Sequence, residues 1–162
     1  MINNRNQILE GLNLEPIMVK AMDEREGYGW SLAFAKRVAD EYRKYLILCV
    51  EHPRAAVVPS NFVDEFWHLH ILDTQKYQAD CDEYLGFFLH HFPYFGMRGE
   101  QDALNLKQAW ADSCALYVAT FGSLPTDLWS ASNRCPNCGS KSKDSRDVFT
   151  EARPMLSDLV AA

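Results

Sequence analysis

The residues best suited to chemistry lie in one stretch, VDEFWHLHILDTQKYQADC, which runs from Val63 to Cys81. Asp64 and His68 are four positions apart, so on a helix they share one face and lie within reach of each other. A carboxylate beside a histidine fixes the imidazole tautomer and raises its basicity, as in metal sites and catalytic pairs. This spacing predicts a metal-binding or proton-transferring pair.

The remaining polar residues of the stretch lie on a different face of that helix. His70 is two positions beyond His68 and faces nearly the opposite way, toward the side that also carries Tyr77 and Cys81. Along one continuous helix His70 and Cys81 would be about 16 Å apart, too far to bind one ion. They can meet only if the chain turns between them, and Asp73-Thr74 supplies two residues that favour helix caps.

Two further imidazoles, His90 and His91, follow Gly86. A helical hairpin that bends at Gly86 would bring one of them back to His68 or His70, with Asp64 as a ligand or as a support for one. Such a set suits zinc, or iron(II) held by two histidines and a carboxylate with open positions. A catalytic site of this kind would act by metal-assisted hydrolysis or by oxidation, on a peptide or a small natural product.

The same residues have a structural interpretation. Trp67, His68 and His70 can be hydrogen-bonded groups of an aromatic core, and Tyr77 and Cys81 can be packing residues, since free cysteine is often buried. The protein would then be a non-enzymatic interaction module with a protein or peptide partner. Its Trp-His-x-His stretch would act as a polar lock between helices.

The spacing of these residues resembles a family pattern. Asp64, Trp67-His68-x-His70, Tyr77, Cys81 and Gly86 follow the pattern of the glycine-rich domain-containing protein-like family, a domain of unknown function. The match runs from Val57 to Pro93, and the leading Val-Pro and the later His-His resemble bacterial members. The resemblance implies a functional site rather than a core of interchangeable apolar residues. It implies no settled activity. Plant members carry glycine-rich and RNA-binding segments, which this chain lacks, so no RNA role is expected.

A second candidate lies at RCPNCG, which holds Cys135 and Cys138. This spacing is typical of a zinc knuckle, in which a turn directs two thiolates at one metal. A complete zinc site would need further ligands. These could be Cys49, Cys81, Cys114 or a histidine of this chain, or residues of a second chain. A redox-active dithiol and two unlinked thiols are the alternatives. Cysteine-rich tails of bacterial members of the resembled family favour metal binding.

The elements expected to position these residues are all helical. Caps and periodicity predict helices that begin near Asn4 and Pro16, after Ser31 and after Ser60, and again at Asp73-Thr74. A long helix is expected over 100–121, and the aromatic segment 87–96 should be packed and irregular. We therefore expect an all-α bundle of about five or six helices over 1–128. A loop-rich tail with a short final helix should follow over 129–162.

Composition narrows the classes of protein. The 162 residues are 48% hydrophobic and 23% charged, with a net charge of −6, which argues against a nucleic-acid-binding protein. The sequence contains no run of about 18 apolar residues, so we expect no membrane span. The first residues, MINNRNQILEG, show no secretory signal, and five cysteines are too few for a disulfide scaffold. We expect a cytoplasmic protein with reduced thiols. Its oligomeric state is not readable.

Overall fold

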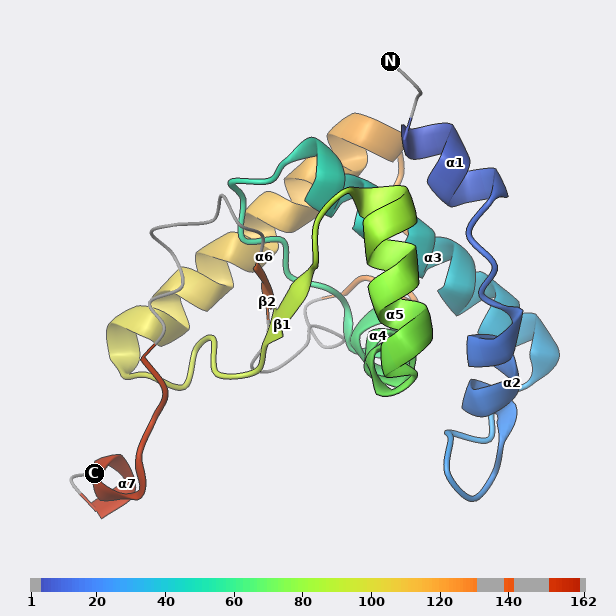
Figure 1. The fold of residues 1–162 in the computed structure, drawn as a ribbon. Coiled ribbons are helices and arrows are strands. Elements are labelled where there is room, and N and C mark those ends of the chain that lie inside the picture. The colour runs from blue at the N-terminus through green and yellow to red at the C-terminus, as the bar shows by residue number, and fades with distance from the viewer. Residues whose placement is uncertain (1–3, 131–138, 142–151, 161–162) are drawn as a thin grey trace.

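The structure, a computed structural model, describes residues 4–130, 139–141 and 152–160, and it is predominantly helical (Figure 1). This confirms the all-α prediction. Within the described residues there are seven α-helices, one π-helical turn and two short strands. They are α1 (Asn4–Glu10), α2 (Glu15–Met22), α3 (Leu32–Glu51), α4 (Asn61–Leu72), α5 (Thr74–Asp80), η1 (Cys81–Leu85), β1 (His90–Phe92), α6 (Glu100–Phe121), β2 (Gly139–Lys141) and α7 (Leu156–Val160).

Several helices begin at the caps that the sequence predicts. The Ser31 hydroxyl accepts a hydrogen bond from the Phe34 amide, and the Ser60 hydroxyl accepts one from the Val63 amide. The Asp73 carboxylate likewise accepts from the Lys76 amide and starts α5. Each cap satisfies an amide that the first helical turn leaves without a backbone partner. The cap at Asp73 makes α4 and α5 two helices rather than one, and so turns the chain between His70 and Cys81.

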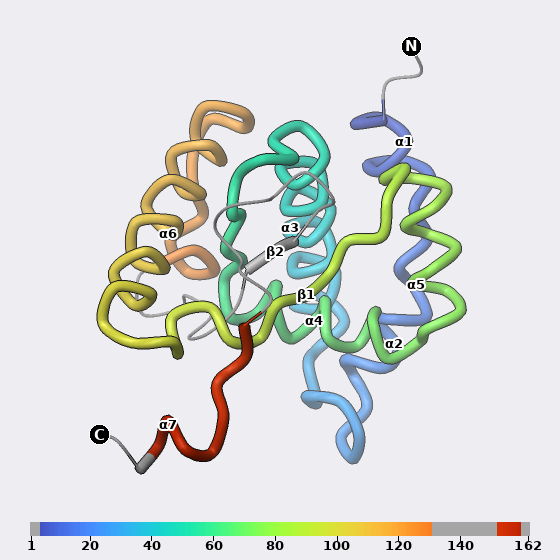
Figure 2. Tube along the Cα trace, turned by 60° about the vertical axis from the view of Figure 1, so that its left-hand side comes forward, coloured from blue at the N-terminus to red at the C-terminus, as the bar shows by residue number. Residues whose placement is uncertain are grey.

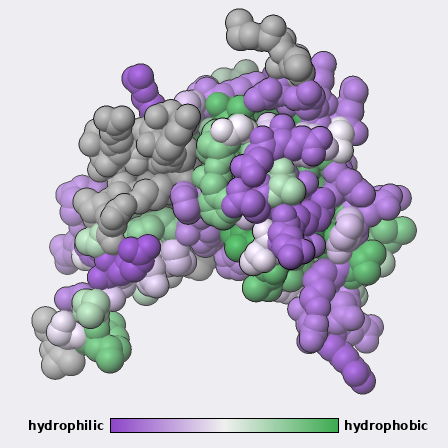
Figure 3. All heavy atoms as spheres, in the orientation of Figure 1, coloured by the Kyte–Doolittle hydropathy of each residue, from purple (hydrophilic) through white to green (hydrophobic). Residues whose placement is uncertain are grey.

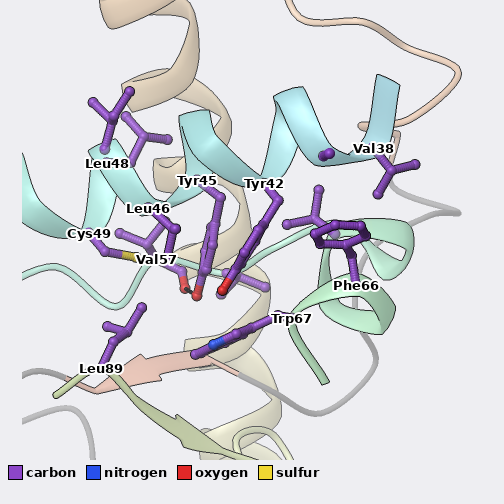
Figure 4. Close-up of a cluster of buried hydrophobic side chains, with 14 of the residues drawn as sticks. Val38, Tyr42, Tyr45, Leu46, Leu48, Cys49, Val57, Phe66, Trp67 and Leu89 are labelled. Carbon is purple, nitrogen blue, oxygen red and sulfur yellow. Dashed lines mark hydrogen bonds between the residues drawn. The ribbon is translucent and has the colours of Figure 1, made fainter. Parts of the chain in front are cut away.

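The core lies around α3, which has α6 on one side and α1, α2 and α5 on the other (Figure 2). Tyr42 and Tyr45 project from α3 toward Trp67 of α4, and Leu89 lies beyond the indole (Figure 4). All four side chains are almost completely buried. The aromatic face of α3 therefore packs against α4, the helix that carries Asp64 and His68.

A small sheet interrupts the helical fold. In it β1 pairs antiparallel with β2, and His91 lies opposite Ser140 in the register. The sequence predicts an irregular segment here from Pro93 and Gly96, and this prediction is wrong for 90–92. Three residues give too short a pattern to reveal a strand. The partner strand is far away in the sequence and supplies no local signal. Pairing with β2 fixes an extended backbone at His91.

The end of α6 connects to the core through a buried carboxylate. Glu41 of α3 accepts hydrogen bonds of 2.8 Å from Lys44, from the Tyr117 hydroxyl and from the Trp129 indole. Trp129 is buried and stacks on Trp110. The residues up to Trp129 therefore pack with the helices. The predicted division of the chain at 128 remains a prediction.

Much of the surface seen in Figure 3 is hydrophilic, and apolar residues show on the projecting α7 and at several places over the other helices. Leu156 and Leu159 of α7 are exposed, as is Met155 just before it. Among the residues that the structure describes, no helix has the length and apolarity needed to cross a bilayer.

Candidate metal centre

Three of the predicted residues come together at one point, and we call Asp64, His68 and His91 the Asp-His-His cluster. Asp64 and His68 lie one turn apart on α4, and His91 comes from β1. The His91 Nε2 atom is 2.7 Å from Asp64 Oδ1, and the His68 Nε2 atom is 3.2 Å from Asp64 Oδ2. The two Nε2 atoms are 2.9 Å from each other. One potential ligand atom of each residue lies within 4.8 Å of the other two.

Protons alone do not satisfy all three of these contacts while Asp64 is ionised. If both Nε2 atoms carry hydrogen, two donors face each other across 2.9 Å. If one is unprotonated, its lone pair faces a carboxylate oxygen with no hydrogen between them. A cation at the centre attracts all three atoms at once. Tetrahedral zinc, with bonds of about 2.0–2.1 Å, places its ligand atoms roughly 3.3 Å apart, so the three contacts need to widen by about 0.1 to 0.6 Å.

The electrostatics of the cluster also favour a cation. Burial tends to raise the pKa of Asp64, but hydrogen bonds from His68 and His91 outweigh it and hold that pKa below its usual value. The hydrogen bond to Asp64 raises the pKa of His68, although burial partly opposes this, and the charge of Glu65 adds to the increase. Asp64 thus places a negative charge beside both imidazoles, and Glu65 adds to the negative potential at His68.

The cluster is open to solvent on one side only. The side chains of Asp64 and His91 are 7% and 11% exposed, whereas that of His68 is 46% exposed. If the three residues held an ion, the exposed side at His68 would leave coordination positions for water or another ligand.

The structure places His70 outside this cluster. Its Nδ1 atom is 2.9 Å from the Tyr42 hydroxyl and its Nε2 atom is 2.8 Å from Asp80 Oδ2. Asp80 also pairs with Lys76 at 2.9 Å. His70 is only 1% exposed, so this network joins α3, α4 and α5 from inside. His68 and His70 therefore lie in different environments, because two positions on a helix differ by about 200°.

Of the other predicted residues that the structure describes, one is exposed and three are buried. His90 is exposed and its ring contacts Phe88, because neighbouring residues of a strand point to opposite faces. Trp67, Tyr77 and Cys81 are buried, and the Trp67 ring contacts that of His91. Cys135 and Cys138 lie outside the described residues, and the zinc knuckle remains a prediction. Sequence reasoning missed Tyr42 and Asp80 as partners of His70. Tyr42 is 28 positions away and leaves no local signal.

Together, the fold and the cluster define an all-α protein with a candidate metal centre formed by one helix and an adjoining strand. The sequence profile of an uncharacterised family, UCP032817-like, matches residues 4–118. The chain therefore belongs to the UCP032817-like family, and the matched region contains the complete Asp-His-His cluster. No curated protein and no solved structure matches the chain.

Proposed function

We propose that the protein binds one divalent transition-metal ion at Asp64, His68 and His91. The observation that carries the proposal is the mutual approach of three ligand atoms whose short contacts no arrangement of protons satisfies while Asp64 is ionised. Two histidines and one carboxylate suit zinc and iron(II), the ions expected from the sequence.

The proposed role of the ion is to activate a bound water or a substrate at an open position beside His68. With zinc this would support metal-assisted hydrolysis, and with iron it would support oxidation. A peptide or a small natural product is our proposed class of substrate. The spacing of the motif also supports our proposal that the glycine-rich domain-containing protein-like family is related to this chain.

Metal analysis of purified variants tests the proposal. The variant with both Cys135→Ser and Cys138→Ser removes the possible knuckle, so any stoichiometric metal that remains belongs to the core. We expect about one zinc or iron per chain in that variant. On the same background, His68→Ala combined with His91→Ala should abolish binding, because only Asp64 of the three ligands remains.

His90→Ala is the matched control, since it removes an imidazole next to His91 without touching the cluster. It should leave the metal content unchanged. The proposal fails if the serine variant, supplied with Zn²⁺ or with Fe²⁺ under anaerobic conditions, binds no ion. It also fails if the double histidine variant binds as well as its parent.

A second candidate function rests on the buried His70 network. The Tyr42–His70–Asp80 hydrogen bonds are those of a polar lock between helices, which supports a non-enzymatic interaction module with a protein or peptide partner. In that case Cys135 and Cys138 would bind zinc or contact the partner, and the serine variant would contain no core metal. The same metal analysis therefore separates the two functions.

A further inference from the structure

His91, the third proposed ligand, lies on a much shorter element than the other two. Asp64 and His68 are held by the hydrogen bonds of a twelve-residue helix, whereas β1 has three residues. A strand of that length does little by itself to fix a side chain to the accuracy that metal binding requires. The contacts of Leu89, two positions before His91, supply the missing constraint.

The carbonyl of Leu89 is held by Tyr77. The Tyr77 hydroxyl donates to the Leu89 carbonyl oxygen and accepts a hydrogen bond of 2.9 Å from the Trp67 indole. Trp67 in turn lies against the imidazole of His91, with ring centroids 4.5 Å apart. Tyr77 and Trp67 thus fix both the backbone that leads to His91 and the surface on which its ring rests.

The backbone of Leu89 also forms a hydrogen bond with the Cys81 thiol, and this bond lowers the pKa of the thiol, as an amide donor does. Burial is the largest influence on the Cys81 thiol and raises its pKa, so the sulfur remains a neutral hydrogen-bonding group. Cys81 follows Tyr77 by four positions, one helical turn, and both side chains are buried. It also begins η1, a π-helical turn of a kind that occurs frequently at functional sites.

We infer that Trp67, Tyr77 and Cys81 are positioning residues that fix His91 as the third ligand of the metal centre. This inference rests on the proposed function. It also gives a role to each of the five motif residues that lie at or near His91. Asp64 and His68 bind, Tyr77 and Cys81 hold the two backbone polar groups of Leu89, and Trp67 supports the imidazole.

The test is Co²⁺ binding by the full chain on the Cys135→Ser, Cys138→Ser background, followed by visible absorption, which reports coordination geometry. Tyr77→Phe keeps the ring and removes the hydrogen bonds of the hydroxyl with Leu89, Trp67 and Cys81. Loss of a group that orients a ligand typically weakens metal binding about 10- to 100-fold. We expect a loss in that range for Tyr77→Phe and for Cys81→Ala, with an altered cobalt spectrum and an unchanged far-UV circular dichroism spectrum.

Tyr42→Phe is the control, because Tyr42 is equally buried but its hydroxyl binds His70 instead of Leu89. It should lower stability and leave Co²⁺ affinity within about threefold of the parent. If Tyr77→Phe does not fold, Cys81→Ala decides alone. Parent-like Co²⁺ affinity in a folded Tyr77→Phe or Cys81→Ala variant overturns the inference. A parent that binds no Co²⁺ contradicts the proposed function itself.

Discussion

At the residue scale, the two histidines of the Trp-His-x-His stretch have opposite environments. His68 is half-exposed beside Asp64, whereas His70 is buried with a partner on each ring nitrogen. The interpretation as a metal site and the interpretation as a polar lock therefore apply to different residues. His68 belongs to the first and His70 to the second.

This difference predicts opposite effects on stability. His70→Ala leaves the buried Tyr42 hydroxyl without its partner, leaves Asp80 with Lys76 alone, and should lower the free energy of unfolding by about 2–4 kcal/mol. His68→Ala should change it by less than about 1 kcal/mol in the metal-free protein, because a half-exposed pair contributes little. Urea unfolding of both variants with chelator present measures the two values. Equal losses would contradict this assignment.

The sequence predicted the pairing of Asp64 with His68, because helical spacing is a local property. It also predicted that His70 can come close to Cys81 only if the chain turns near Asp73. It left the choice between His90 and His91 open. That choice depends on the pairing of β1 with β2 and on the contacts of Leu89, which join residues distant in the sequence.

At the element scale, the start of α6 depends on one carboxylate. Asp102 accepts hydrogen bonds from the amides of Gly96 and Arg98 and from the Arg98 guanidinium. Burial tends to raise the pKa of Asp102, but the Arg98 side chain and the two amides outweigh it and lower that pKa below 3.8. A carboxyl with a lowered folded-state pKa stabilises the protein above its unfolded-state pKa. The contribution is lost as the pH falls through the folded-state value.

Asp102→Asn should therefore cost about 1–3 kcal/mol of unfolding free energy at neutral pH. The difference from the wild type should begin to shrink as the pH is lowered below about 3.8, where the carboxyl of the unfolded chain is protonated, and it should disappear once the pH is below the lower folded-state pKa. Urea unfolding at several pH values measures this. Asp112→Asn is the control on the same helix, because Asp112 is exposed and bonds only to Gln108 among the contacts described. A constant difference at all pH values would exclude the charge of Asp102 as the cause.

The caps show why the starts of three helices were predictable. Ser31, Ser60 and Asp73 each act within three residues of their own position, so local sequence determines where α3, α4 and α5 begin. The two-stranded sheet was not predictable in this way. Its strands have three residues each, and their pairing depends on the rest of the fold.

At the scale of the whole molecule, one core joins elements from α1 to Trp129. The buried cluster includes Ile8 near its start and Trp129 near its end, and Glu41 connects α3 to both α6 and Trp129. A chain whose core is shared in this way should unfold as one cooperative unit.

Tryptophan fluorescence and far-UV circular dichroism should therefore give coincident urea-unfolding curves. The four tryptophans lie before α3, in α4, in α6 and after α6, so their emission samples the whole core. A fluorescence transition at a lower urea concentration than the helical transition would contradict a single unit. It would show that part of the core opens before the helices unfold.

The contact between His68 and His91 joins positions 23 residues apart in the chain. Closing a loop of that size in an unfolded chain costs roughly 3 kcal/mol of conformational entropy. An ion bound by both imidazoles would thus act as a removable cross-link between a helix and a strand. Under the proposed function, the supply of the ion would govern the lifetime of the folded protein as well as its chemistry.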